Sequence, residues 1–223
     1  MEVLQVGQSV QGRPLEVFLV GTKPPFIHFY GGVHGDEPES VDLVCNLKKY
    51  LEKNTQKKFL RSILVFPNCN PDGSAMNQRM NAHGVDLNRN FPTKNWSKEC
   101  KEMRYFPGER PGSEPEISIL LGLIQAYPPE IIVSVHSLIP HQMNYDGPAK
   151  RLAYAMAQKN NYPVTDHIGY PTPGSLGEYA GRERKIAVIT FELPEKIAPD
   201  VAWKSSLEAM LAAISFPAKD LTF

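Results

Sequence analysis

The chain has 223 residues, with 24 Lys plus Arg, 24 Asp plus Glu and a formal net charge of zero. That length suits one compact domain with a substantial core, and the balanced charge excludes a global field that would attract nucleic acid or an anionic membrane. The three cysteines have no CxxC spacing, which argues against a disulfide framework and a thiolate zinc site. The first residues, MEVLQVG, have neither a basic start nor an apolar core, so we expect one cytoplasmic domain over residues 1–223, without a signal peptide or propeptide.

Predicted strands and helices alternate along the chain. Leu15–Val20 and Phe26–Tyr30 are β-prone runs joined by the turn-rich segment GTKPP, a pattern typical of neighbouring strands. Apolar residues then recur at helical spacing from Glu37 to Glu52. Three further strands are predicted at Ile63–Phe66, Ile131–Val135 and Ile186–Phe191. They alternate with helices predicted at about Glu114–Ala126, about Pro148–Lys159 and Ala202–Ile214. This order predicts an α/β fold with a mixed, mostly parallel twisted sheet and helices on both faces, whose functional residues gather at strand ends.

A long polar connection from about residue 68 to residue 112 interrupts this pattern. It is rich in Asn, Pro, Gly and Arg and has no clean periodicity, and loops of such length are commonly functional or disordered. Arg79 and Arg89 lie within it and could present two guanidinium groups to anions, such as a terminal carboxylate or an oxyanion at a scissile carbonyl. The alternative is a pair of solvated loop arginines.

Two histidines and a glutamate are candidate metal ligands. His34 and Glu37 follow a predicted strand that ends in two glycines, and His136 comes directly after the apolar run Ile131–Val135. Considered separately, an HxxE pair in a surface turn and a core histidine explain these residues without a metal. Together they form a set that is common in catalytic zinc sites, where a fourth position remains for water or substrate. The HExxH, HxxEH and EF-hand patterns are absent from the sequence, so the metal would be bound from loops.

Glu192 ends the largely apolar run that begins at Ile186. A carboxylate at the end of a buried strand is costly to bury without a partner, and the alternative is a solvated turn residue. If this carboxylate faces the metal site, it can take a proton from the attacking water and return it to the leaving amine. Glu192 is therefore the candidate general base and acid.

The ordered set of motifs resembles the metallocarboxypeptidase family typified by carboxypeptidase A. These motifs are His34-x-x-Glu37, Arg79, Asn88-Arg89, His136-Ser137 and Phe191-Glu192-Leu193, and the resemblance runs from about Val3 to Pro194. It implies a metallocarboxypeptidase-like (phosphorylase/hydrolase-like) fold and a peptide hydrolase with one Zn²⁺ ion. The substrate would be a small peptide with a free C-terminal carboxylate. The sequence indicates neither a nucleic-acid nor a membrane partner, and no oligomeric state.

The resemblance also implies roles at the metal site. His34, Glu37 and His136 would be the zinc ligands, and Glu192 would act as general base and acid. Asp86 would orient the first zinc histidine from outside the ligand shell, where such partners fix the tautomer and basicity of the ring.

Further roles follow for substrate binding. Arg79 would polarise the scissile carbonyl and stabilise the oxyanion, while Asn88 and Arg89 would receive the terminal carboxylate. Tyr179 is similar to the family's mobile tyrosine, which closes over bound substrate.

Three segments resemble one branch of the family, the bacterial murein peptide amidases: Tyr145–Ala149, Gly169–Gly177 and Ile189–Pro194. The implied substrate is L-Ala-γ-D-Glu-meso-diaminopimelate, cut between γ-D-glutamate and diaminopimelate during the recycling of cell-wall peptides. Because diaminopimelate carries a second ammonium and a second carboxylate, its pocket should offer an acid. Asp146 and Glu178 are the candidates.

Two other interpretations remain. A protein deglutamylase or an N-acylamino-acid deacylase would keep the three metal ligands and Glu192 and would differ in its product. A zinc-binding interaction domain without turnover would have lost its base or its substrate arginines, but Glu192, Arg79 and Arg89 are all present.

Overall fold

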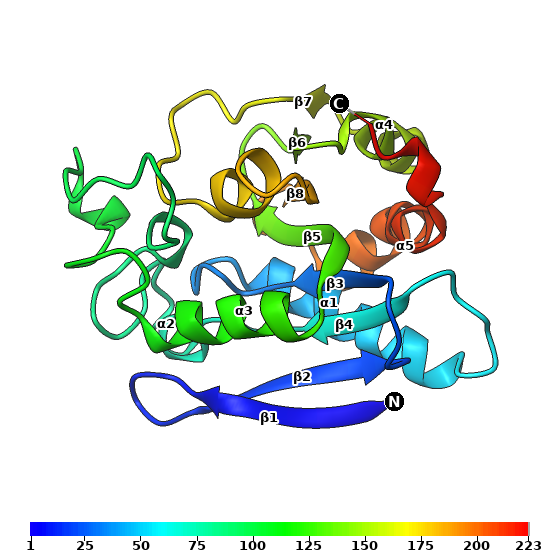
Figure 1. The fold of residues 1–223 in the computed structure, drawn as a ribbon, viewed down its shortest axis with the longest axis horizontal. Coiled ribbons are helices and arrows are strands. Elements are labelled where there is room, and N and C mark those ends of the chain that lie inside the picture. The colour runs from blue at the N-terminus through cyan, green and yellow to red at the C-terminus, as the bar shows by residue number, and fades with distance from the viewer. Residues whose placement is uncertain (223) are drawn as a thin grey trace.

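The computed structural model describes residues 1–222, and in them one mixed sheet runs between two layers of helices (Figure 1). The strands are β1 Glu2–Gln8, β2 Pro14–Val20, β3 Phe26–Tyr30, β4 Ser62–Phe66, β5 Pro129–Ser137, β6 Gln142–Asp146, β7 Val164–Thr165 and β8 Ala187–Leu193. The α-helices are α1 Pro38–Lys53, α2 Pro71–Met76, α3 Pro115–Ala126, α4 Lys150–Asn160 and α5 Pro199–Ser215. Short 3₁₀ turns are η1 Leu87–Arg89, η2 Met103–Tyr105 and η4 Ala218–Asp220, and η3 Gly177–Arg182 is a π-helical segment.

The strand order is β1-β2-β4-β3-β5-β8-β6-β7. The central strands β4, β3, β5 and β8 are parallel to one another, while the β1–β2 hairpin at one edge and β6 next to β8 add antiparallel pairs. The predicted mixed, mostly parallel sheet with helices on both faces is confirmed. Its consequence for function is that β3, β5 and β8 all end at the same edge.

One predicted neighbourhood is wrong. The segment GTKPP was expected to join adjacent strands, but β4 lies between β2 and β3 and pairs with both. The partner of β2 along the chain is instead β1, which was not predicted as a strand, and β6 and β7 were also missed. A turn-rich connection fixes where a strand ends, whereas pairing depends on which apolar faces meet.

Apolar side chains fill both faces of the sheet. Leu43, Leu47 and Leu51 of α1 are fully buried and pack with residues of α4 and α5 against one face. The other face is covered by α3, whose Leu120 is fully buried, and by η3. Each such leucine contributes about 1.5–3 kcal/mol by its removal from water. Among the helices of residues 1–222, none combines the length and apolar character needed to cross a membrane.

Buried amides hold the predicted polar connection in place. Asn81 Nδ2 donates to Glu114 Oε2 at 2.8 Å, and Asn90 Nδ2 donates to the carbonyl oxygen of Pro107 at 2.7 Å. Both asparagines are fully buried. Because a buried amide is costly to leave without partners, these contacts fix the segment that carries Arg79 and Arg89.

Candidate active site

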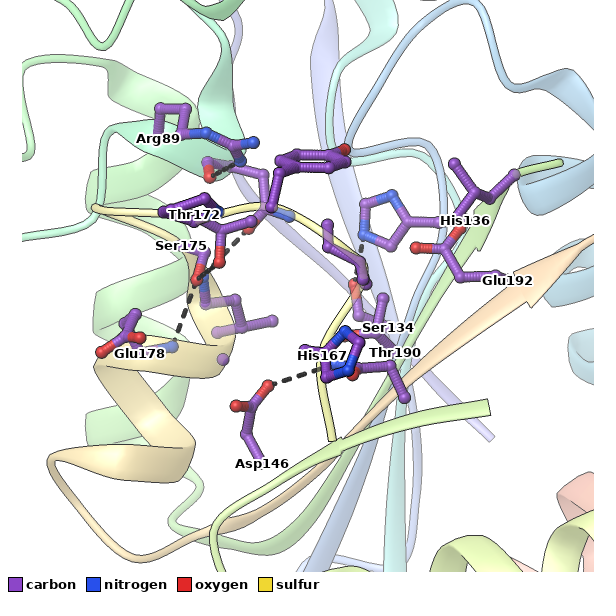
Figure 2. A pocket seen from close by; sticks show the side chains of 18 of the residues that line it. Arg89, Ser134, His136, Asp146, His167, Thr172, Ser175, Glu178, Thr190 and Glu192 are labelled. Atoms are coloured by element: carbon purple, nitrogen blue, oxygen red, sulfur yellow. Dashed lines mark hydrogen bonds between the residues drawn. The ribbon is translucent and has the colours of Figure 1, made fainter. Parts of the chain in front are cut away.

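Three strand ends bring His34, Glu37, His136 and Glu192 to one edge of the sheet. His34 and Glu37 lie between the end of β3 at Tyr30 and the start of α1, while His136 and Glu192 are paired in register near the ends of β5 and β8. Because β3, β5 and β8 are parallel, their carboxyl ends meet at the same place. Figure 2 shows His136 and Glu192 on adjacent strands at one side of the cavity described below.

The side chains of His34, Glu37 and His136 converge on one buried point. Their donor atoms lie within 4.8 Å of one another. His34 Nδ1 is 2.7 Å from Glu37 Oε1 and 3.1 Å from His136 Nδ1, and His136 Nδ1 is 3.0 Å from Glu37 Oε2. Two facing imidazole nitrogens need a shared proton or a cation between them. Two nitrogens and a carboxylate oxygen are donors that zinc prefers, so the three residues fit a zinc ion.

The carboxylate of Glu37 is held in its anionic form. Burial alone would raise the pKa of this carboxyl, but the imidazoles of His34 and His136 outweigh burial and lower the pKa below its usual range. The backbone N–H of Ser137 also donates to Glu37 Oε2 at 3.3 Å. Glu37 is therefore suited to act as an anionic ligand.

Polar groups lie close to the outer ring nitrogens of the two histidines. His34 Nε2 lies 3.3 Å from Asp86 Oδ1, and His136 Nε2 lies 3.0 Å from Ser134 Oγ. An acceptor for the proton on Nε2, such as the carboxylate of Asp86, leaves Nδ1 of the ring with its lone pair directed to the shared point. Asp86 thus lies where the sequence predicted it, behind the first histidine.

Glu192 is 5% exposed and adjoins the His34–Glu37–His136 group. Burial raises the pKa of Glu192 from 4.5 to about 7; His136 and Arg79 oppose this rise, and the charge on Glu37 adds to it. A carboxyl group with a pKa near 7 exchanges protons readily at physiological pH, which suits a general base or acid.

The two predicted arginines lie at the same site. Arg79 Nη1 is 3.2 Å from His34 Nδ1. Arg89 is 5% exposed and donates from Nη1 to the carbonyl oxygen of Asn88 at 2.7 Å. The guanidinium carbons of Arg79 and Arg89 lie 5.2 and 5.4 Å from the centre of the Tyr105 ring, a residue that sequence reasoning did not select. A face of Tyr105 close to both cations stabilises them by cation–π attraction.

A cavity of about 780 Å³, called here the first cavity, connects these groups. Its lining includes most of the predicted site residues, namely His34, Glu37, Arg79, Asn88, Arg89, His136, Asp146, Glu178 and Glu192. Figure 2 shows Arg89 across the cavity from His136 and Glu192, with Asp146 and Glu178 at another end. The cavity therefore has a metal-binding side, a cationic wall and a separate polar end.

The polar end contains a charged network. Arg182 Nε donates to Asp146 Oδ1 at 2.8 Å, and Arg182 Nη1 lies 3.0 Å from Glu178 Oε1. Burial raises the pKa of Asp146, although Arg182 partly offsets this effect. Sequence reasoning missed Arg182, which the four-residue spacing from Glu178 within a helix could have indicated. This end offers both an acid and a cation.

Tyr179, the predicted mobile tyrosine, lies outside the lining of the first cavity. Its ring packs 5.6 Å from that of Phe91 and 3.4 Å from the guanidinium carbon of Arg184. Tyr170 lines the cavity instead, and its ring centre is 6.0 Å from the guanidinium carbon of Arg89. Tyr179 sits on a helical segment whose apolar side faces the core, whereas Tyr170 lies in the preceding loop.

Close backbone contact positions the loop that carries His34. A Cβ atom on Gly35 would lie 2.0 Å from the carbonyl carbon of Gly73 in α2, so the two backbone segments leave no room for a side chain at Gly35. Asn70 adds amide contacts of 3.4 Å to the carbonyl oxygen of Val33 and 3.3 Å to that of Arg79. These contacts tie the His34 loop to the Arg79 segment.

The sequence and the fold are similar to those of known proteins. A model of the zinc carboxypeptidase family matches residues 1–205. Murein peptide amidase A of Escherichia coli (strain K12) is 36% identical over 201 residues, covering 85% of this chain and 79% of that protein. The crystal structure of a murein-tripeptide amidase from Escherichia coli O157 has a TM-score of 0.75 at 30% identity, covering 96% of this chain and 92% of that one. Carboxypeptidase A from Helicoverpa armigera shares the fold, with a TM-score of 0.83 at 19% identity over 99% of this chain and 68% of that one.

Proposed function

The chain belongs to the zinc carboxypeptidase family, and from this premise we propose that it hydrolyses the γ-D-glutamyl-meso-diaminopimelate bond of L-Ala-γ-D-Glu-meso-diaminopimelate. The murein peptide amidase relatives support this substrate class. We further propose that it acts in the cytoplasm during the recycling of peptidoglycan peptides. A single zinc ion held by His34, Glu37 and His136 would supply Lewis-acid chemistry, polarising the scissile carbonyl and lowering the pKa of the attacking water.

Glu192 moves the proton in this proposal. Its carboxylate accepts a proton from the attacking water and later delivers it to the nitrogen of the departing diaminopimelate. The buried position of Glu192 beside His136, with its pKa raised to about 7, supports both steps. Arg79 supplies a fixed positive charge near the developing oxyanion, and its link to the buried Asp86 keeps that charge in place.

Arg89 and Asn88 recognise the terminal carboxylate. A guanidinium group matches a carboxylate in shape and charge, and Arg89 is buried among the groups that line the first cavity. Binding of a terminal carboxylate explains removal of a C-terminal residue, since an internal residue would leave these polar groups unmatched. Tyr170 takes the place proposed for Tyr179, on the loop over this carboxylate position.

The polar end of the first cavity suits the distal part of diaminopimelate. That side chain ends in both an ammonium and a carboxylate, and Asp146, Glu178 and Arg182 offer the opposite charges. An apolar C-terminal side chain would displace water from this charged network without offering it a hydrogen-bond partner, which is unfavourable. The observation that carries the proposal is this pairing, in one cavity, of a buried His–Glu–His group beside Glu192 with a charged far end.

Product analysis tests the proposal. Zinc-loaded protein would be incubated with the murein tripeptide, an ordinary C-terminal L-peptide and an N-acylamino acid, beside Glu192→Gln as the matched variant. We expect diaminopimelate release by the wild type, detected by mass spectrometry, and its loss in the variant. Release only from the ordinary peptide or the acylamino acid would overturn the substrate assignment, and turnover of none of the three would favour a zinc-binding domain without activity.

A further inference from the structure

A second cavity, of about 820 Å³, opens beside the first. The two cavities share five lining residues, Glu37, Arg79, Ser137, Leu138 and Tyr170. Arg79 and Glu37, one of the candidate metal ligands, therefore lie at the boundary between them. If the scissile carbonyl lies at this boundary and the departing residue fills the first cavity, the acyl part of the substrate extends into the second.

The lining of the second cavity includes an exposed arginine, Arg104. Arg104 belongs to η2, and its guanidinium carbon lies 5.2 Å from the centre of the Tyr105 ring. Within residues 1–222, its guanidinium makes no ion pair and no hydrogen bond. A charged donor group that lines a cavity beside the candidate active site is available to an anionic ligand.

Acidic residues restrict where an anion can lie in this cavity. They come from the start of α1 and from the segment after β8, and they are Asp36, Glu39, Asp42 and Glu195. These carboxylates repel an anion, so the favourable positions are beside Arg104, Arg79 and Lys196. Arg79 is already paired with Asp86 at 2.9 Å. Arg104 is therefore better placed than Arg79 to bind a ligand carboxylate that lies away from the scissile bond.

We propose that Arg104 recognises the free α-carboxylate of the residue on the acyl side of the scissile bond. This inference rests on the proposed function. In a γ-linked D-glutamate, the α-carboxylate is free and is separated from the scissile carbonyl by a short aliphatic chain. The guanidinium carbons of Arg79 and Arg104 both lie 5.2 Å from the centre of the Tyr105 ring. A carbonyl held at Arg79 therefore leaves the carboxylate within reach of Arg104, and Arg104 is a specificity-determining residue for γ-linked substrates.

Paired substrates and variants test this inference. The first substrate is the murein tripeptide, and the second differs only in having the D-glutamate α-carboxylate replaced by a carboxamide. We expect wild-type kcat/KM to be higher for the carboxylate by about tenfold, as for a charge-assisted hydrogen bond. Arg104→Gln should lose this preference, because its kcat/KM for the carboxylate falls by about tenfold while that for the carboxamide falls much less. Arg184→Gln is the matched control, since Arg184 also stacks on a tyrosine but lines neither cavity, and it should behave like the wild type.

A binding measurement separates this inference from the proposed function. Calorimetry would follow binding of the dipeptide L-Ala-γ-D-Glu and of its α-carboxamide counterpart to the zinc-loaded protein, without any need for turnover. We expect Arg104→Gln to weaken dipeptide binding by about the same tenfold factor. An unchanged carboxylate preference in Arg104→Gln, or an equal loss on both substrates, would overturn the inference even if the tripeptide is cleaved. If the tripeptide is not cleaved, the proposed function fails, while dipeptide binding still decides whether Arg104 recognises the carboxylate.

Discussion

Asp86 Oδ2 accepts a hydrogen bond from Arg79 Nε at 2.9 Å. The other carboxylate oxygen of Asp86 lies 3.3 Å from His34 Nε2, so one buried carboxylate connects a candidate metal ligand to the candidate oxyanion-binding arginine. Burial would raise the pKa of Asp86, but the charges of Arg79 and His34 outweigh burial and lower the pKa. The orientation of the imidazole and the position of the guanidinium are therefore coupled.

Replacement of this carboxylate should affect both groups at once. Asp86→Asn removes the negative charge that faces both His34 and Arg79, and it replaces one of the two acceptor oxygens with an amide NH₂ group. We therefore expect zinc affinity to fall by about 10- to 100-fold and kcat/KM to fall with it. Competition with a chromophoric chelator measures the affinity. Asp200→Asn, which changes an exposed carboxylate at the start of α5, is the control. Normal zinc affinity in Asp86→Asn would exclude the proposed positioning role.

Zinc removal should lower thermal stability as well as activity. A ligand that binds only the folded state stabilises it by about 4 kcal/mol at a concentration of a thousand times its Kd. We expect a chelator to lower Tm and added zinc to restore it, as measured by scanning calorimetry. His136→Ala should show little zinc-dependent shift in Tm, because one of the three proposed ligands is missing. A wild-type Tm that ignores both chelator and zinc would contradict the metal site.

A methyl group at Gly35 should disturb the site through the backbone. Gly35→Ala puts a Cβ atom 2.0 Å from the carbonyl carbon of Gly73, so we expect the free energy of unfolding to fall by about 1–3 kcal/mol and zinc affinity to fall because His34 is displaced. Gly122→Ala is the control: no atom lies within 4 Å of its added Cβ, and it is helical, so stability should rise by about 0.5–1 kcal/mol. Urea denaturation measures both values, and equal effects of the two substitutions would argue against a tight contact at Gly35.

The buried His28 should make stability depend on pH. His28 is fully buried, its Nδ1 lies 2.6 Å from Tyr30 Oη, and burial lowers the pKa of His28 from 6.5 to about 3, an effect that the Tyr127 backbone partly offsets. Between these two pKa values the unfolded chain binds more protons at this histidine than the folded protein does. The His28 contribution to stability therefore decreases as pH falls from about 6.5 towards 3, with a limiting slope of about 1.4 kcal/mol per pH unit.

The measurement compares wild type with His28→Gln, which keeps a hydrogen-bonding side chain but does not titrate. We expect the difference between their free energies of unfolding to be constant above about pH 7.5 and to shift in favour of the variant as pH falls. Other titrating groups cancel in this difference. A difference that stays constant from about pH 4 to about pH 8 would contradict the assigned pKa of His28.

The grouping of the candidate metal ligands with Glu192 could be predicted because these residues lie at or just beyond strand ends. His34, His136 and Glu192 each follow an apolar run closely, and parallel strands bring their carboxyl ends together. The same pattern predicted the α/β class and both helix layers. The structure brings the predicted residues into one cavity, and their chemical roles stay predictions until they are measured.

Strand β6 could not be recognised from hydrophobic periodicity. Gln142, Asn144 and Asp146 alternate along it and are all buried, and Asn144 and Asp146 line the first cavity. A strand whose inward side chains are polar has the pattern of an exposed strand or a loop. The polar residues that line the cavity thus prevented the prediction of the strand that carries them.

The choice between the two tyrosines depends on a local turn that spacing does not reveal. Tyr170 and Tyr179 flank the same Gly-Ser pair, Gly174 and Ser175. The π-helical segment η3 turns Tyr179 towards Phe91 and the core. Because a π-helical turn changes which side chains share a face, sequence alone did not indicate which ring faces the cavity.

Three of the four arginines that line the two cavities come from one part of the chain. Arg79, Arg89 and Arg104 all come from the connection between α2 and α3, whereas the candidate metal ligands and Glu192 come from the sheet and the loop after β3. These three candidate anion-binding arginines are therefore encoded in one contiguous stretch of sequence, separate from the candidate metal ligands and Glu192. If these arginines bind substrate as proposed, exchange of that stretch between relatives would alter substrate choice without altering the strands that carry His136 and Glu192.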